Sequence, residues 1–110
     1  MTARRGEVWF LDFDPVVGRE QAGYRPALVL SSDIANGAGM VTVLPITSKP
    51  RPYPTRVGII PPDGGLQVPS WVMGEQPRTV DARRLRRLVG NVSAPVMRRV
   101  EDVVRILLGL

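Results

Sequence analysis

Turn-forming residues cut most of this chain into short apolar runs, and this division limits the folds open to it more than any other feature. The 110 residues include 11 glycines and 11 prolines, most of them before the last stretch of the chain. Because proline breaks helices and is tolerated only at the edges of sheets, the runs between these residues are predicted to be strands. About seven short strands at regular spacing predict a mainly β fold, a small antiparallel barrel.

The predicted strands are rich in branched and aromatic residues. They cover residues 7–13, 26–31, 40–47, 55–60, 66–75 and 88–92, with a further extended path over 76–80. Between them, Asn36-Gly37 predicts a tight hairpin turn, and the proline-dense segment 48–54 predicts an extended loop. Pro45 is expected at a sheet edge or bulge, and Asp81 is expected to cap one helical turn. The core is predicted to contain four aromatic residues: Trp9, Phe10, Phe13 and Trp71.

One long helix is predicted, over residues 94–108. Ser93 is a good N-cap, Pro95 lies in the first turn, and Gly109 is a suitable stop. Seven apolar residues share one face of it at helical spacing: Val96, Met97, Val100, Val103, Val104, Leu107 and Leu108. This stripe predicts a core contact or a dimer interface. No repeat, linker or second domain is found, so residues 1–110 are expected to form one domain.

Charge and composition narrow the possible functions. The formal net charge is +5 and the pI is about 11.0, which favours a polyanionic partner such as a nucleic acid, an acidic protein or a membrane surface. The sequence has no histidine and no cysteine, so it lacks the usual general acid/base, the commonest metal ligand and any thiolate site. The lack of cysteine, of a signal peptide and of a membrane-spanning run predicts a cytoplasmic protein.

Polar groups that a β fold does not need collect in three segments. The first is the glycine-punctuated loop 18–26, which contains Arg19, Glu20, Tyr24 and Arg25; the others are residues 47–51 and 75–78. If the strands on either side of residues 32–39 pair antiparallel, Arg25 at the start of one lies beside Thr47 at the end of the other.

An arginine, a threonine hydroxyl and a nearby glutamate suit the cleavage of RNA by its own 2′-hydroxyl. Arg25 would bind two phosphate oxygens and stabilise the charge that builds on phosphorus. Glu20 is ionised at neutral pH and could accept the 2′ proton, and Thr47 could bond a non-bridging oxygen or the leaving group. The alternative for each is structural: a solvated loop residue, a surface ion pair or an ordinary strand threonine.

Other residues near this loop are suited to holding RNA. Tyr24 and Tyr53 lie in basic segments, where a base could stack on either ring. The arginine run at residues 83–87 is expected to be a solvated face, with a phosphate track as the second interpretation.

Several motifs together resemble the MazF/PemK family of toxin endoribonucleases. They are Gly6-Glu7-Val8-Trp9, Asp12-Phe13-Asp14-Pro15, the run from Gly18 to Ser31 that includes Glu-Gln-Ala-Gly-Tyr-Arg-Pro, Val43-Leu44-Pro45-Ile46-Thr47-Ser48, Glu75-Gln76-Pro77-Arg78-Thr79-Val80-Asp81, Arg84-Leu85 and the last helix. The resemblance implies an SH3-like barrel with a C-terminal helix, a homodimer, and sequence-specific cleavage of single-stranded RNA that needs no metal or other cofactor. It also implies products with 2′,3′-cyclic phosphate and 5′-hydroxyl ends, with arrest of translation and growth.

The resemblance also assigns site residues. The family's motif arginine, threonine and glutamate match Arg25, Thr47 and Glu20, and its RNA-holding glutamine matches Gln76. The remaining RNA-binding candidates are Arg19, Tyr24, Ser48, Lys49, Arg51, Tyr53 and Arg78. Some members carry histidine where this chain has Tyr24, which implies a change in base preference or in proton transfer. An acidic MazE-like antitoxin is expected to cover the RNA groove with its tail.

Two other functions fit the same kind of fold. A CcdB-like poison of DNA gyrase relies on a tryptophan near its C-terminus, and this chain ends in Leu107-Leu108-Gly109-Leu110. A non-catalytic RNA-binding barrel would retain RNA without cutting it.

Overall fold

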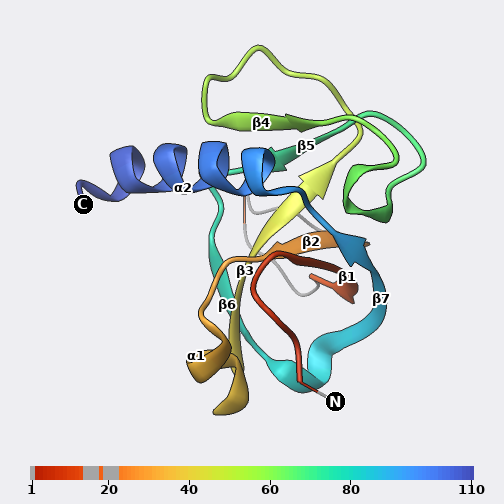
Figure 1. The fold of residues 1–110 in the computed structure, drawn as a ribbon, viewed down its shortest axis with the longest axis vertical. Coiled ribbons are helices and arrows are strands. Elements are labelled where there is room, and N and C mark those ends of the chain that lie inside the picture. The colour runs from red at the N-terminus through yellow and green to blue at the C-terminus, as the bar shows by residue number, and fades with distance from the viewer. Residues whose placement is uncertain (1, 14–17, 19–22) are drawn as a thin grey trace.

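An antiparallel sheet with one long helix beside it makes up the fold (Figure 1). The computed structural model describes residues 2–13, 18 and 23–110. Within these residues the strands are β1 Glu7–Asp12, β2 Tyr24–Val29, β3 Met40–Thr47, β4 Arg56–Ile59, β5 Ser70–Met73, β6 Arg78–Asp81 and β7 Leu85–Asn91. The helices are α1 Asp33–Gly37 and α2 Ala94–Leu108, with 3₁₀ turns η1 at Asp63–Gly65 and η2 at Ala82–Arg84.

The strands follow the order β4-β5-β3-β2-β1-β7, and β6 pairs with β3 off this path. Along β3 the outer partner changes from β6, which pairs with residues up to Val43, to β5, which pairs from Ile46 onward. Pro45, which has no N–H to donate, lies where β3 changes from one of these partners to the other. This position agrees with the prediction that Pro45 lies at a sheet edge or bulge. The predicted antiparallel β fold with a C-terminal helix is confirmed, but the sheet is open: in the described part of the chain, β4 and β7 each pair with one strand.

Both faces of the central strands are buried, because side chains alternate between two apolar clusters. One cluster includes Val8, Leu28 and Leu44 and packs against buried valines of α2. The other includes Trp9 and Phe13, together with Ala27, Val29, Val41 and Val43. This double burial explains why β1 to β3 are almost continuously apolar in sequence.

The helix α2 begins and ends as predicted. The Ser93 hydroxyl accepts a hydrogen bond from the backbone N–H of Val96, and Gly109 closes the last turn with a φ of 72°. Its first turns bury Val96, Val100 and Val104 against the sheet. Its C-terminal end projects beyond the sheet (Figure 1) and leaves Ile106, Leu107, Leu108 and Leu110 exposed. The predicted apolar stripe is therefore core over its first turns and uncovered over its last.

The hairpin turn predicted at Asn36-Gly37 is wrong, because these residues belong to α1. Ser32 caps this helix by accepting a hydrogen bond from the backbone N–H of Ala35, and the buried side chain of Asn36 bonds to Ser31. The positive φ needed to reverse the chain falls on Gly39, at 95°. A side-chain cap and a buried amide thus override the turn preference of the dipeptide.

The turn η1 packs backbone to backbone on β7, and only glycine permits this approach. A Cβ added to Gly65 would lie 2.2 Å from the carbonyl oxygen of Val89, and one added to Gly90 would lie 2.8 Å from the backbone of Gly64. The strand predicted over residues 66–75 is shorter in the structure, where β5 covers only Ser70–Met73. The residues before Ser70 form the irregular segment that follows η1. That segment forms one wall of a hollow described below.

Candidate functional site

Arg25 stands between two hollows on the molecular surface. The smaller one, named here the Thr47 hollow, has a volume of about 240 Å³ and is lined by Arg25, Thr47, Lys49, Arg51, Arg56 and Met73. The larger one, named the Phe10 hollow, has a volume of about 440 Å³, and its lining includes Phe10, Tyr24, Arg25, Ser48, Gln67 and Arg87. A ligand that contacts Arg25 can therefore reach both.

Strand register brings Arg25 and Thr47 together as the sequence predicts. Strands β2 and β3 run antiparallel with Ala27 opposite Pro45. Arg25 lies two residues before Ala27 and Thr47 lies two residues after Pro45, so the same register brings these two positions side by side. Both side chains line the Thr47 hollow. The guanidinium and hydroxyl thus converge on one space, as phosphate chemistry at this site would require.

The Thr47 hollow is strongly cationic. Four of its described lining residues carry a positive charge: Arg25, Lys49, Arg51 and Arg56. Lys49 and Arg51 belong to the exposed loop that follows β3. Cations gathered around a small concave surface attract and hold an anion. Arginine adds a planar pair of donors that fits two oxygens of one phosphate.

Arg56 is fixed in the floor of this hollow by Glu75. The Nη2 atom of Arg56 lies 2.7 Å from a carboxylate oxygen of Glu75, and its Nε donates to the same carboxylate at 2.8 Å. The Arg56 side chain is only 8% exposed, and its guanidinium lies 4.9 Å from the centre of the Tyr53 ring. Burial raises the pKa of Glu75, but hydrogen bonds from Arg56 and Thr55 outweigh it and hold the pKa below its usual value.

Thr47 is 6% exposed, and its hydroxyl oxygen accepts a hydrogen bond from the backbone N–H of Lys49 at 3.1 Å. A hydroxyl that accepts one bond still has its own hydrogen to donate. The arrangement therefore fixes the first residues of the loop after β3 and leaves the hydroxyl able to donate a hydrogen bond to an oxygen in the hollow.

The Phe10 hollow carries a row of stacked side chains from three neighbouring strands. The rings of Phe10 and Tyr24 stack with centres 5.1 Å apart and planes inclined by 20°. The guanidinium of Arg87, which lies opposite Phe10 in the β1–β7 register, is 4.7 Å from the centre of the Phe10 ring. This wall is aromatic over most of its length and positively charged at one end.

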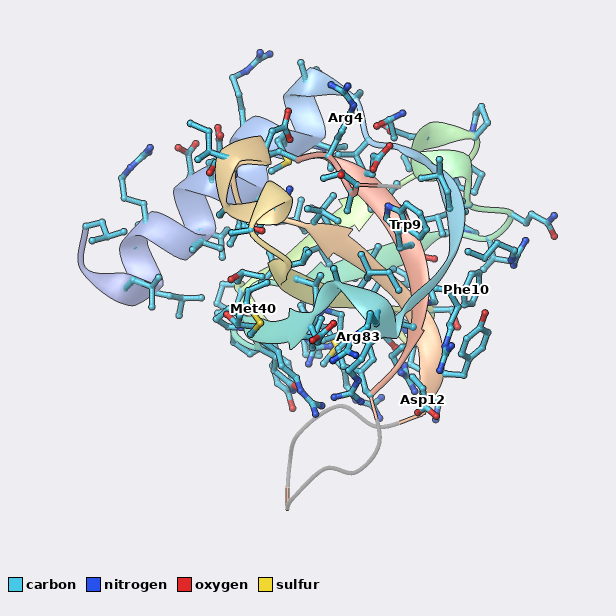
Figure 2. The ribbon with its side chains drawn as sticks, turned by 90° about the horizontal axis from the view of Figure 1, so that it is seen from below. Arg4, Trp9, Phe10, Asp12, Met40 and Arg83 are labelled. Carbon is cyan, nitrogen blue, oxygen red and sulfur yellow. The ribbon has the colours of Figure 1, made fainter. Side chains whose placement is uncertain are left out.

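The prediction that Phe10 belongs to the core is wrong. Trp9 and Phe13 are buried as predicted, whereas Phe10 and Trp71 are only partly buried. Trp9 packs in one of the two core clusters whereas its neighbour on β1, Phe10 (both labelled in Figure 2), lines the hollow, as alternation along a strand requires. The outer side of β1 faces the hollow, so Phe10 contributes to its wall.

The structure distributes the predicted RNA-binding residues unevenly. Tyr24 and Ser48 line the Phe10 hollow, and Lys49 and Arg51 line the Thr47 hollow. Tyr53 lines neither hollow, but its ring packs on Arg56, which lines the Thr47 hollow.

Neither hollow is lined by Gln76 or Arg78. The Nη1 atom of Arg78 donates to the carbonyl oxygen of Phe13 at 2.6 Å, and its guanidinium lies 5.7 Å from the centre of the Phe13 ring. These contacts hold the Arg78 guanidinium against Phe13. The predicted residues Arg19 and Glu20 lie outside the described residues.

Two lining arginines were not singled out from the sequence. Arg56 resembles any charged residue of an exposed strand, and its partner Glu75 is 19 positions away, so no local pattern marks the pair. Arg87 was placed in a solvated arginine run. Its position beside Phe10 depends on the β1–β7 register, which includes two irregularities that a sequence pattern does not reveal.

Two features are absent from the described part of the chain. No three histidine, cysteine, aspartate or glutamate residues there gather around a common point. Among the same residues, no helix has both the length and the apolar character to cross a bilayer.

Comparison with known proteins gives consistent matches over the whole fold. Residues 4–108 match the sequence profile of the family described as "PemK-like, MazF-like toxin of type II toxin-antitoxin system". The chain is 39% identical over 114 residues to endoribonuclease MazF9 of Mycobacterium tuberculosis, with 97% of each chain covered. The crystal structure of MazF from Deinococcus radiodurans superposes with a TM-score of 0.90 at 33% identity, covering 100% of this chain and 99% of the other. A chain from a MazE–MazF structure of the same organism superposes with a TM-score of 0.83 at 32% identity, covering 100% and 98%.

Proposed function

From the premise that this chain belongs to the PemK-like, MazF-like family and is a toxin endoribonuclease of a toxin–antitoxin system, we propose that it cuts single-stranded RNA at specific sequences without a metal ion. The observation that carries this proposal is the position of Arg25 and Thr47 in one cationic hollow. The products would carry 2′,3′-cyclic phosphate and 5′-hydroxyl ends, and loss of intact RNA would stop translation and growth.

The proposed reaction uses the RNA's own 2′-hydroxyl as nucleophile. Its oxygen loses its proton to Glu20 and forms a bond to the adjacent phosphorus, the bond from phosphorus to the 5′ oxygen breaks, and the departing 5′ oxygen takes up a proton from solvent water. Arg25 stabilises the negative charge that builds on the phosphate oxygens and remains protonated throughout, since the pKa of arginine is above about 12. Thr47 donates a hydrogen bond to a phosphate oxygen or to the leaving oxygen, and Glu20 accepts the 2′ proton.

Residues around the two hollows would hold the RNA on either side of the cleaved linkage. Lys49 and Arg51 bind flanking phosphates, and Ser48 bonds the backbone or a base. Tyr24 and Tyr53 offer rings to unpaired bases, which makes single-stranded RNA the preferred substrate. In the same proposal, Arg19, Gln76 and Arg78 extend the binding surface.

The same cationic surface would accept an acidic antitoxin. The formal net charge of +5 favours such a partner, and MazF of Deinococcus radiodurans has been solved in a MazE–MazF structure. An acidic MazE-like tail lying over the Thr47 hollow would exclude RNA by occupying its phosphate site. We also propose that the toxin is a cytoplasmic homodimer. A dimer contact is supported by Ile106 near the end of α2 and Leu110 just after it, which are 80% and 84% exposed.

Mapping of RNA ends tests the proposal. Purified full-length protein is incubated with single-stranded RNA in EDTA, and the fragments are sequenced and their ends identified chemically. We expect cuts at a short recurring sequence, with cyclic phosphate on one fragment and a free hydroxyl on the other. Cutting that requires added magnesium, RNA retained but left intact, or inhibition of DNA gyrase without RNA cleavage would each contradict it.

A further inference from the structure

We propose that the Phe10 hollow is a nucleobase site that selects the base next to the cleaved linkage, and that it prefers guanine. This inference rests on the proposed function, because it assumes that the phosphate of the same nucleotide occupies the Thr47 hollow. Arg25 lines both hollows, so the two sites adjoin at one side chain. A phosphate held there by Arg25 would leave its base at the mouth of the Phe10 hollow.

The walls of this hollow suit a flat aromatic ligand. The stacked rings of Phe10 and Tyr24 contribute to one wall, and Leu66 and Val68, from the segment after η1, contribute to another. The volume of about 440 Å³ lies within the usual range for small-molecule sites. Apolar and aromatic walls bind the faces of any base, so these residues supply affinity but little selectivity.

Selectivity would come from Arg87 at the charged end of the aromatic row. Its guanidinium lies over the Phe10 ring, and the described residues provide no hydrogen bond or ion pair to the Arg87 side chain. A guanidinium that lies over a ring keeps its N–H groups directed outward in its own plane. Two such groups match the adjacent O6 and N7 acceptors of guanine.

The backbone around the hollow is constrained enough to discriminate between bases. Gly65 and Gly90 allow η1 to lie directly on β7, so the segment that contributes Leu66 and Gln67 is held against the strand that contributes Arg87. The amide of Gln67, which also lines the hollow, could bond a second edge of the base. A base that lacks the matching acceptors would leave donors of Arg87 without partners.

Substitution of Arg87 tests the assignment against a neighbouring control. Arg87→Gln removes the paired donors and one charge, and Arg86→Gln removes one charge from the adjacent residue, which lines neither hollow. Cut sites of wild type and both variants are mapped on a random-sequence RNA. We expect wild type and Arg86→Gln to share a guanine preference beside the cut, and Arg87→Gln to lose it by roughly ten-fold or more. An unchanged preference in Arg87→Gln, or an equal loss in both variants, would overturn the inference.

A binding measurement separates this inference from the proposed cleavage. The four nucleoside 5′-monophosphates are titrated into the full-length protein while backbone amide signals are followed by NMR. We expect GMP to bind more tightly than the other three, to shift signals of residues 65–68 and of β7, and to bind wild type more tightly than Arg87→Gln. Shifts of this kind would support the base site even if no RNA were cut. Equal binding of all four nucleotides, or shifts confined to other surfaces, would overturn it.

Discussion

The ion pair between Arg56 and Glu75 gives a direct test of how the floor of the Thr47 hollow is built. Glu75→Gln keeps the size of the side chain and removes its charge. The Arg56 side chain is 8% exposed and the Glu75 side chain 26% exposed, so the guanidinium would lose charged hydrogen bonds in a place that water only partly reaches. A hydrogen bond to a charged group is worth about 1.5–3 kcal/mol, and we expect a loss of about 2 kcal/mol in the free energy of unfolding.

A loss of this size is measurable by thermal unfolding. For a domain of this length, 1 kcal/mol corresponds to about 4 °C in Tm, so Glu75→Gln should lower Tm by roughly 8 °C at pH 7. Asp102→Asn is the matched control, since it breaks a 3.3 Å pair with Arg105 whose side chains are 71% and 58% exposed. Exposed pairs contribute about 0–1 kcal/mol, so the control should unfold close to wild type.

The effect should also depend on pH with a definite sign. Since the pKa of Glu75 is lowered in the fold, its stabilisation is complete above the unfolded pKa of about 4.3 and is lost as the pH falls through the folded pKa. The Tm difference between wild type and Glu75→Gln should therefore be full at pH 7 and shrink below about pH 4. A difference of less than about 2 °C at pH 7, or one that persists unchanged in acid, would refute the reasoning.

Three further predictions follow from other parts of the structure. Replacing Lys49 and Arg51 together by alanine should weaken RNA binding and make its salt dependence shallower by about two units of slope, measured by fluorescence anisotropy at several salt concentrations; an unaltered slope would place the phosphates elsewhere. Gly90→Ala should destabilise the fold by about 1–3 kcal/mol in urea unfolding, because its Cβ would lie 2.8 Å from the backbone of Gly64; a fully stable variant would contradict this packing. The side chain of Arg83 donates hydrogen bonds that lower the pKa of Asp81 to about 2, so Arg83→Gln should raise the pKa seen by NMR titration, and no change would exclude that cause.

The parts of the fold that follow from local pattern could be predicted from the sequence. Helix α2 has a cap, a stop and a regular apolar stripe, and the structure confirms its predicted bounds of 94–108. The antiparallel pairing of β2 and β3 also follows from the sequence, and the structure confirms that it places Arg25 beside Thr47. The first inference depends on signals within one helix, and the second on two strands that a short connection joins.

Features that depend on distant residues could not be predicted in this way. Phe10 reads as a core residue because β1 is apolar throughout, and only the neighbouring strands decide that its outer side faces a hollow. The pairing of Arg56 with Glu75 depends on the β4–β5 register, which places Arg56 opposite Met73, two residues before Glu75. One local feature is also hidden in the sequence: at Asn36 a buried amide bonded to Ser31, five residues earlier, overrides the turn preference of the dipeptide.

Single-turnover cleavage of one single-stranded RNA in EDTA, compared among wild type, Arg25→Ala and Arg86→Ala, tests the central claim most directly. Both variants lose one arginine, but only Arg25 lines the hollow that contains Thr47. We predict that Arg25→Ala cuts at least a hundred-fold more slowly, roughly the loss expected when one donor to developing charge is removed. Arg86→Ala should cut at close to the wild-type rate, and both variants should unfold near the wild-type Tm. Comparable cleavage by wild type and a folded Arg25→Ala would contradict the account.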